Sequence, residues 1–129
     1  MIQITYDRRH NAVVIEFSGK IDAEQGEQYL PKIPKVIPKH GRGFALLVDL
    51  SSVESMDPKV QDTITKAMDL FNAAGVTRVI RVNPDPDRGI GFNILSIFHY
   101  AKNVKILTLP SRAEAMKRLM NNSSYGPPP

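Results

Sequence analysis

Hydrophobic and polar residues alternate over two short stretches at the start of the chain. Ile2, Ile4 and Tyr6 alternate with polar residues, and a second alternation covers residues 13–18. A period of two is typical of a half-buried β-strand, so both stretches are predicted as strands. The polar link between them, residues 7–11, is short enough to predict an antiparallel hairpin.

Three later stretches are rich in apolar residues. Residues 44–50 are apolar almost throughout, which is typical of a central strand buried on both faces in a parallel sheet. Residues 76–82 and 104–109 are predicted as two further strands. The polar residues 51–56, which follow the first of these runs, are predicted as a loop.

Helical periodicity is clearest in the segment from Asp57 to Gly75. Aspartate is a good N-cap, and proline at the first helical position loses no useful donor, so Asp57-Pro58 predicts a helix start. Gly75 is a suitable C-terminal cap. The apolar residues between them recur at helical spacing and form one buried stripe: Val60, Ile64, Ala67 and Phe71.

The proline-rich segment 22–39 is predicted as a kinked or split helix. Asp22 is its expected N-cap. Pro31, Pro34 and Pro38 each remove a backbone donor and disfavour a helix interior, so a single straight helix is not expected.

Two more helices are predicted in the C-terminal half. The first covers about residues 88–102. A capping box formed by Ser111 and Glu114 opens the second. Its inner side is expected to consist of Met116, Leu119 and Met120.

Together the elements follow the order β-β-α-β-α-β-α-β-α. Alternating strands and helices indicate βαβ units, so the sequence predicts an α/β fold with a mixed sheet of about five strands. Residues 1–120 are expected to form a single domain, and the proline-rich tail, residues 121–129, is expected to be disordered.

Composition narrows the classes of function and compartment. The chain has 129 residues with a net charge of +4, and its basic residues are scattered, so a nucleic-acid partner is not expected. No apolar run approaches the length of a membrane span, and the first residues lack a signal-peptide pattern. The absence of cysteine agrees with the cytoplasm as the expected compartment.

No arrangement of residues predicts a metal, a cofactor or a nucleophilic centre. His10, His40 and His99 lack partners at zinc-ligand spacing. Gly89 and Gly91 precede a helix, but Ile94 replaces the third glycine of a dinucleotide fingerprint. An enzyme that uses Asp49 or Asp57 as a base remains the minor alternative.

The segment VDLSSVESMDPKV, residues 48–60, resembles the STAS family, which takes its name from sulfate transporters and anti-sigma-factor antagonists. The segments 13–24, 73–82 and 111–119 resemble other parts of that family in the same order. The resemblance covers about residues 1–120 and implies a STAS-like fold with a regulatory, non-enzymatic function in protein–protein interaction. It also implies a protein partner, such as an anti-sigma factor or a kinase-like regulator.

The resemblance places the partner surface on the loop and helix that follow the central strand. We call its residues the 51–62 surface: Ser51, Ser52, Ser55, Asp57, Pro58, Lys59 and Asp62. The anti-sigma-factor antagonists of this family are switched by phosphorylation of the second serine in a D-S-S-G motif. Asp57 matches the aspartate of that motif, but Lys59 stands at the phosphorylated serine and Val60 at the glycine. The resemblance therefore implies a docking module without this phospho-switch.

Simpler interpretations of the same residues remain open. Asp57 is explained by helix capping alone, and the serines are ordinary turn residues. A small-ligand or lipid-binding domain of related fold is an alternative function, based on the apolar segment 90–101. Self-association through exposed strand edges or the proline-rich helix is a third hypothesis, which Lys32, Lys35 and Lys39 disfavour. The sequence alone does not predict the oligomeric state.

Overall fold

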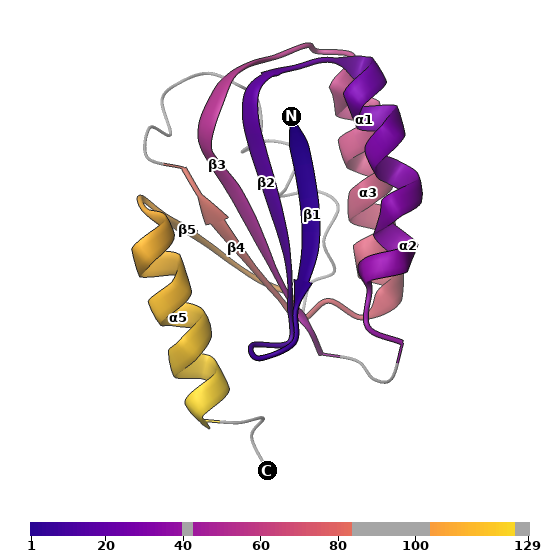
Figure 1. Cartoon of the computed structure of the whole chain (residues 1–129). Helices are drawn as coiled ribbons and strands as arrows, with labels where there is room; N and C mark the ends of the chain where they lie inside the picture. Colours follow the sequence, from indigo (N-terminus) through magenta and orange to yellow (C-terminus); the bar gives the residue numbers. More distant parts are fainter. Residues whose placement is uncertain (40–42, 84–103, 126–129) are drawn as a thin grey trace.

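The computed structural model of the chain describes residues 1–39, 43–83 and 104–125. Within these residues, one five-stranded sheet has the strand order β1-β2-β3-β4-β5 (Figure 1). The strands are β1 (Ile2–Asp7), β2 (Ala12–Ile21), β3 (Ala45–Met56), β4 (Arg78–Val82) and β5 (Lys105–Leu109). β1 is antiparallel to β2, and the other neighbouring strands are parallel. The predicted α/β class, mixed sheet and N-terminal hairpin are therefore confirmed.

Helices lie on both faces of the sheet (Figure 1). The first face carries α1 (Ala23–Tyr29), the 3₁₀ helix η1 (Leu30–Lys32), α2 (Ile33–Val36) and α3 (Val60–Ala74). The second face carries α5 (Arg112–Tyr125). The helix predicted for residues 88–102 falls on residues outside the described part of the chain.

The proline-rich segment forms three short helical pieces, which confirms the predicted split. Asp22 caps α1, and its carboxylate accepts a hydrogen bond of 2.9 Å from the Gln25 amide. Pro31 and Pro34 each stand in the first positions of a new helical piece. A missing backbone donor costs little there, because the first amides of a helix have no partner within it.

The sheet separates two hydrophobic clusters of unequal size. The larger one lies against α1, α2 and α3, and its most buried members include Phe44, Leu46 and Phe71. The smaller one lies under α5 and includes Leu47 and Leu119. Adjacent residues of β3 thus enter opposite clusters, which confirms that residues 44–50 form a central strand buried on both faces.

β3 continues beyond its apolar part, and the prediction of a loop at residues 51–56 is wrong. This polar stretch pairs with the end of β2, where Ser18 stands opposite Ser52 and Ile21 opposite Met56. β2 is longer than predicted as well, so its backbone groups supply the partners. Backbone pairing with β2 therefore keeps a segment of low apolar content in the strand conformation.

α5 begins as predicted, and two of the three residues expected on its inner side, Met116 and Leu119, do pack against the smaller cluster. The Ser111 hydroxyl accepts a hydrogen bond of 3.2 Å from the Glu114 amide, as expected for the cap. Ala115 and Leu119 are fully buried, whereas Met120 is 53% exposed, so the expectation that Met120 lies on the inner side is wrong. The helix also continues to Tyr125, past the domain boundary expected at residue 120.

α1 and α3 approach each other closely at Gly26. A Cβ atom built at Gly26 lies 3.1 Å from Thr63 Cγ2 and 3.3 Å from Thr63 Oγ1. Thr63 is buried and its β-branched side chain has little rotamer freedom in a helix. The contact between the two helices therefore leaves little room for a side chain at position 26, and a larger residue requires Thr63 to shift by a few tenths of an ångström.

The Gly26→Ala variant is expected to lower the free energy of unfolding by about 1 kcal/mol. Overpacking costs about 1–3 kcal/mol, which exceeds the gain in helix propensity of about 1 kcal/mol. Urea denaturation measures the change. In a Thr63→Ala background the same substitution is expected to be neutral or stabilising, and an equal loss in both backgrounds contradicts the steric explanation.

Candidate functional site

Most side chains of the 51–62 surface are accessible to solvent. Ser51, Ser52, Ser55, Pro58, Lys59 and Asp62 are exposed, and Asp57 is half-buried. Two apolar residues within the same stretch, Val53 and Val60, are each only 1% exposed. The surface is therefore a polar layer attached to the hydrophobic core at two positions.

Asp57 organises the turn between β3 and α3. Its Oδ1 accepts a hydrogen bond of 2.9 Å from the Lys59 amide, and its own amide donates one of 2.8 Å to the carbonyl of Ile21. α3 itself begins at Val60 with Lys59 as its N-cap residue, so the N-cap expected at Asp57 is wrong by two positions. The Asp57 carboxylate still accepts a hydrogen bond from a backbone amide just before α3, which is the role that a capping residue has.

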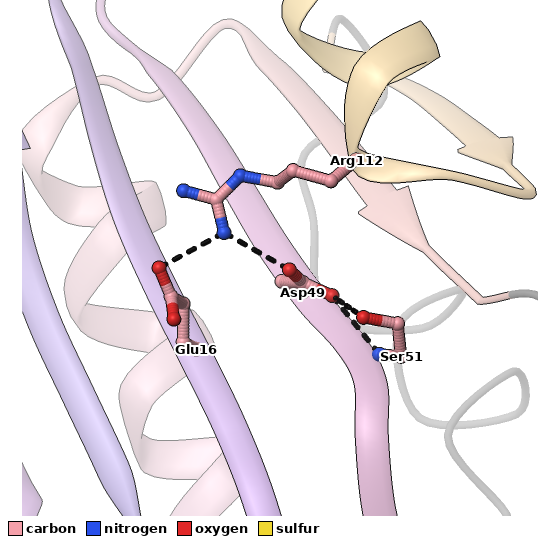
Figure 2. Close-up of polar contacts among 4 residues, drawn as sticks. All are labelled: Glu16, Asp49, Ser51 and Arg112. Atoms are coloured by element: carbon pink, nitrogen blue, oxygen red, sulfur yellow. Dashed lines mark hydrogen bonds and ion pairs between the residues drawn. The ribbon is translucent and has the colours of Figure 1, made fainter.

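A buried carboxylate lies just before the 51–62 surface, on the face of the sheet that α5 covers (Figure 2). Asp49 is 8% exposed. Its Oδ1 accepts hydrogen bonds from the Ser51 amide at 2.9 Å and from the Ser51 hydroxyl at 2.6 Å. Its Oδ2 lies 2.9 Å from Nη1 of Arg112, and the same nitrogen lies 2.9 Å from Oε1 of Glu16. The cluster thus links β2, β3 and the first residue of α5.

These contacts keep Asp49 ionised. Burial raises the pKa of a carboxyl group, but the hydrogen bonds from Ser51 and Arg112 and the charge of Arg112 outweigh this effect. The pKa of Asp49 is therefore held below its usual value of 3.8. Both oxygens are occupied and the proton affinity is low, which makes Asp49 a poor general base.

The hydrogen bond from the Ser51 amide to Asp49 coincides with an irregularity in the sheet. Glu16 stands opposite Asp49, but Ser18 stands opposite Ser52, so β3 contains one more residue than β2 over this interval. An extra residue loses its ladder partner, and here Asp49 supplies one for Ser51. The Asp49 cluster therefore stabilises the bulge from which the exposed part of β3 begins.

Sequence reasoning did not find Glu16 or Arg112. Asp49 gave a signal, because a charged residue within an apolar run needs a partner when it is buried. The partner lies 63 positions away in the chain, and no local spacing identifies it. Only the packing of α5 on the sheet brings the two residues together.

The apolar segment 90–101, on which the small-ligand or lipid alternative is based, lies outside the described residues, so that alternative stays a prediction. Among the described residues no His, Asp and Glu side chains gather into a metal-binding cluster, and no helix is long and apolar enough to cross a membrane. An apolar cavity of about 50 Å³ lies between the sheet and α1 and α3. An engineered cavity that binds benzene measures about 150 Å³, so this one is too small for a lipid chain.

Comparison with solved structures shows which known fold this arrangement resembles. SpoIIAA, an anti-sigma factor antagonist, matches in its unphosphorylated form with a TM-score of 0.61 at 21% identity, over 95% of this chain and all of that one. SpoIIAA from Bacillus in its phosphorylated form matches with a TM-score of 0.60 at 23% identity, over 92% and 99% of the two chains. An uncharacterized protein from Shewanella loihica matches with a TM-score of 0.67 at 14% identity, over 92% of both chains.

The chain has the SpoIIAA-like fold. The predicted STAS-like architecture is therefore confirmed at the level of the fold. No protein-family model and no curated protein matches the sequence.

The Arg112→Met variant tests the contribution of the ion pair between Arg112 and Asp49 to stability. It is expected to lower the free energy of unfolding by about 1–3 kcal/mol at neutral pH, which is the usual contribution of a hydrogen bond to a charged group. The loss is expected near the lower end of that range, because Arg112 is partly exposed and solvent screens its charge. It is also expected to raise the pKa of Asp49, which NMR titration measures.

The difference in stability between wild type and Arg112→Met is expected to decrease as the pH falls. The lowered pKa of Asp49 stabilises the fold above its unfolded value of 3.8, and this stabilisation is lost as the pH falls through the folded value. Denaturation curves of wild type and Arg112→Met are therefore expected to converge in acid. Lys117→Met, a change at an exposed position of α5, is the control, and a difference that persists in acid contradicts the assignment.

Proposed function

We propose that the chain is a regulatory protein-docking module of the cytoplasm, which binds its partner through the 51–62 surface. The SpoIIAA-like fold supports this proposal, because several of the similar solved structures are anti-sigma factor antagonists. The observation that carries it is the exposure of Ser51, Ser52, Pro58, Lys59 and Asp62 along the end of β3, the following turn and the start of α3, which are anchored to the core.

The rigidity of the 51–62 surface favours its use in binding. Val53 and Val60 are buried, the Asp57 amide is bonded to β2, and the Ser51 amide is bonded to Asp49. Groups that are already ordered lose little conformational entropy when a partner binds. The partner in this proposal is a protein such as an anti-sigma factor or a kinase-like regulator.

Control by phosphorylation at position 59 is not part of the proposed mechanism. Lysine has no hydroxyl group, and Lys59 places a positive charge in the turn where a phosphorylated serine adds about two negative charges. The partner group that contacts Lys59 is therefore expected to be acidic, and the group that contacts Asp62 is expected to be basic. We further propose that the module has no catalytic activity, since Asp49, the buried carboxylate beside the surface, is already fully occupied by Ser51 and Arg112.

Charge reversal on the 51–62 surface tests the proposed interface. Lys59→Glu and Asp62→Lys are each expected to weaken binding to the cognate partner by roughly tenfold, because each places like charges against each other across the interface. Titration calorimetry with a purified anti-sigma or kinase-like partner measures the affinity. Lys117→Glu, on the opposite face of the sheet, is the matched control and is expected to bind as wild type does. Unchanged affinity in both surface variants contradicts the proposed interface.

Restoring the missing acceptor tests the absence of the phospho-switch. Wild-type protein incubated with the kinase-like partner and ATP is expected to gain no phosphate in the 51–62 surface, whereas Lys59→Ser is expected to gain one at the new serine. Intact-protein and peptide mass spectrometry measure the modification. Phosphorylation of wild type at Ser51, Ser52 or Ser55 contradicts this part of the proposal.

A further inference from the structure

β1 forms an edge of the sheet that is separate from the 51–62 surface. It pairs with β2 on one side, and no described strand pairs with its other side. Figure 1 shows β1 at the near edge of the sheet, with α1 and α2 to one side and α5 to the other. The β1 edge is thus open to a further strand within the described part of the chain.

The register identifies which backbone groups the β1 edge presents. The Ser18 amide donates a hydrogen bond of 2.9 Å to the carbonyl of Met1, so these two residues form a hydrogen-bonded pair. Hydrogen-bonded and non-bonded pairs alternate along an antiparallel ladder. Ile2, Ile4 and Tyr6 are therefore in non-bonded positions, and their amide and carbonyl groups point outward.

The usual protection of an edge strand is missing here. Natural edges carry lysine, proline or a bulge, which discourage the addition of another strand. Between Ile2 and Tyr6 β1 has no charged residue and no proline, and its register with β2 is regular. The strand is thus suited to accept a further one.

A cleft of about 260 Å³ lies beside the first residues of β1. It is lined by Met1, Ile2, Gln25, Gln28, Tyr29 and Lys32. Within the described residues, Gln25 Oε1 is buried without a hydrogen-bond partner. A buried acceptor without a partner is costly, and a donor from a bound molecule would relieve that cost.

Two lysines lie near the β1 edge. Lys32 lines the cleft, and Lys35 is exposed on α2, which contacts β1. Side chains at alternate positions of an added strand lie on the same face as Ile2 and Ile4, which is the face that carries these lysines. Acidic residues at those positions complement Lys32 and Lys35.

We propose that the β1 edge binds an extended acidic segment of a partner protein by strand addition. The backbone of that segment pairs with Ile2, Ile4 and Tyr6, which provides affinity, and its alternate acidic side chains contact Lys32 and Lys35, which provides specificity. A second copy of this chain fits less well, because it brings its own lysines to the same face of the joint sheet.

NMR titration of the ¹⁵N-labelled protein tests the proposal. The probe is a blocked peptide of about nine residues, enough to cover the strand, in which valine and glutamate alternate. Amide signals of Ile2, Ile4 and Tyr6 and the side-chain amide of Gln25 are expected to shift as the peptide is added up to on the order of 1 mM. The same peptide with lysine in place of glutamate is expected to bind at least roughly tenfold more weakly.

Two variants and a control separate the contribution of the Lys32 charge from that of backbone pairing along β1. Lys32→Glu is expected to reduce affinity for the glutamate peptide by roughly tenfold, whereas Lys117→Glu, an equal change of charge on α5, is expected to leave it unchanged. Ile4→Pro removes an outward donor without removing a bond to β2, and it is expected to abolish binding while the protein stays folded. Circular dichroism confirms folding.

Several outcomes overturn the proposal. One is no shift at β1 with the glutamate peptide, and another is equal binding of the lysine peptide. A third is a shift of the β1 signals with protein concentration alone, accompanied by a doubled mass in light scattering, because a second copy then occupies the edge. Since none of these measurements uses the 51–62 surface, their failure leaves the proposed docking function in place.

Discussion

Asp49 constrains the structure more than any other polar residue described. A charged carboxylate within a central strand is tolerated only when hydrogen bonds and an opposite charge replace its lost hydration. Arg112 and Ser51 supply them, and each brings a separate element to the same point: Arg112 the start of α5, and Ser51 the bulge in β3. Asp49 therefore contributes both to the position of α5 on the sheet, together with the buried Ala115 and Leu119, and to the start of the 51–62 surface.

The parts of the fold that local patterns determine were predictable. Residues 44–50 are apolar on both sides of the strand, and Val60, Ile64 and Phe71 recur at helical spacing, so the sequence alone identified the central strand and α3. Asp62 is exposed, as expected for a polar residue of α3 that falls outside this apolar stripe.

The features that sequence reasoning missed arise from contacts between distant segments. β3 remains a strand beyond Leu50 because β2 pairs with it, although Ser51 and Ser52 have low strand propensity. Met120 is exposed because Ala115 and Leu119 are the residues of α5 that meet the sheet. Arg112 is the partner of Asp49 for the same reason, and one-dimensional periodicity contains no information about such a pairing.

The hairpin of β1 and β2 has a consequence for the folding of the chain. Its two strands are neighbours in sequence, so they pair on a microsecond timescale, whereas β2 and β3 pair only after residues 22–44 have crossed over the sheet. Until β3 pairs with β2, the hairpin has unpaired backbone amide and carbonyl groups along both of its edges. In the described part of the folded sheet only the β1 edge of this hairpin keeps them. A hairpin that forms before β3 and α3 have packed onto it leaves apolar side chains and backbone groups open to solvent, which is the kind of surface that molecular chaperones bind.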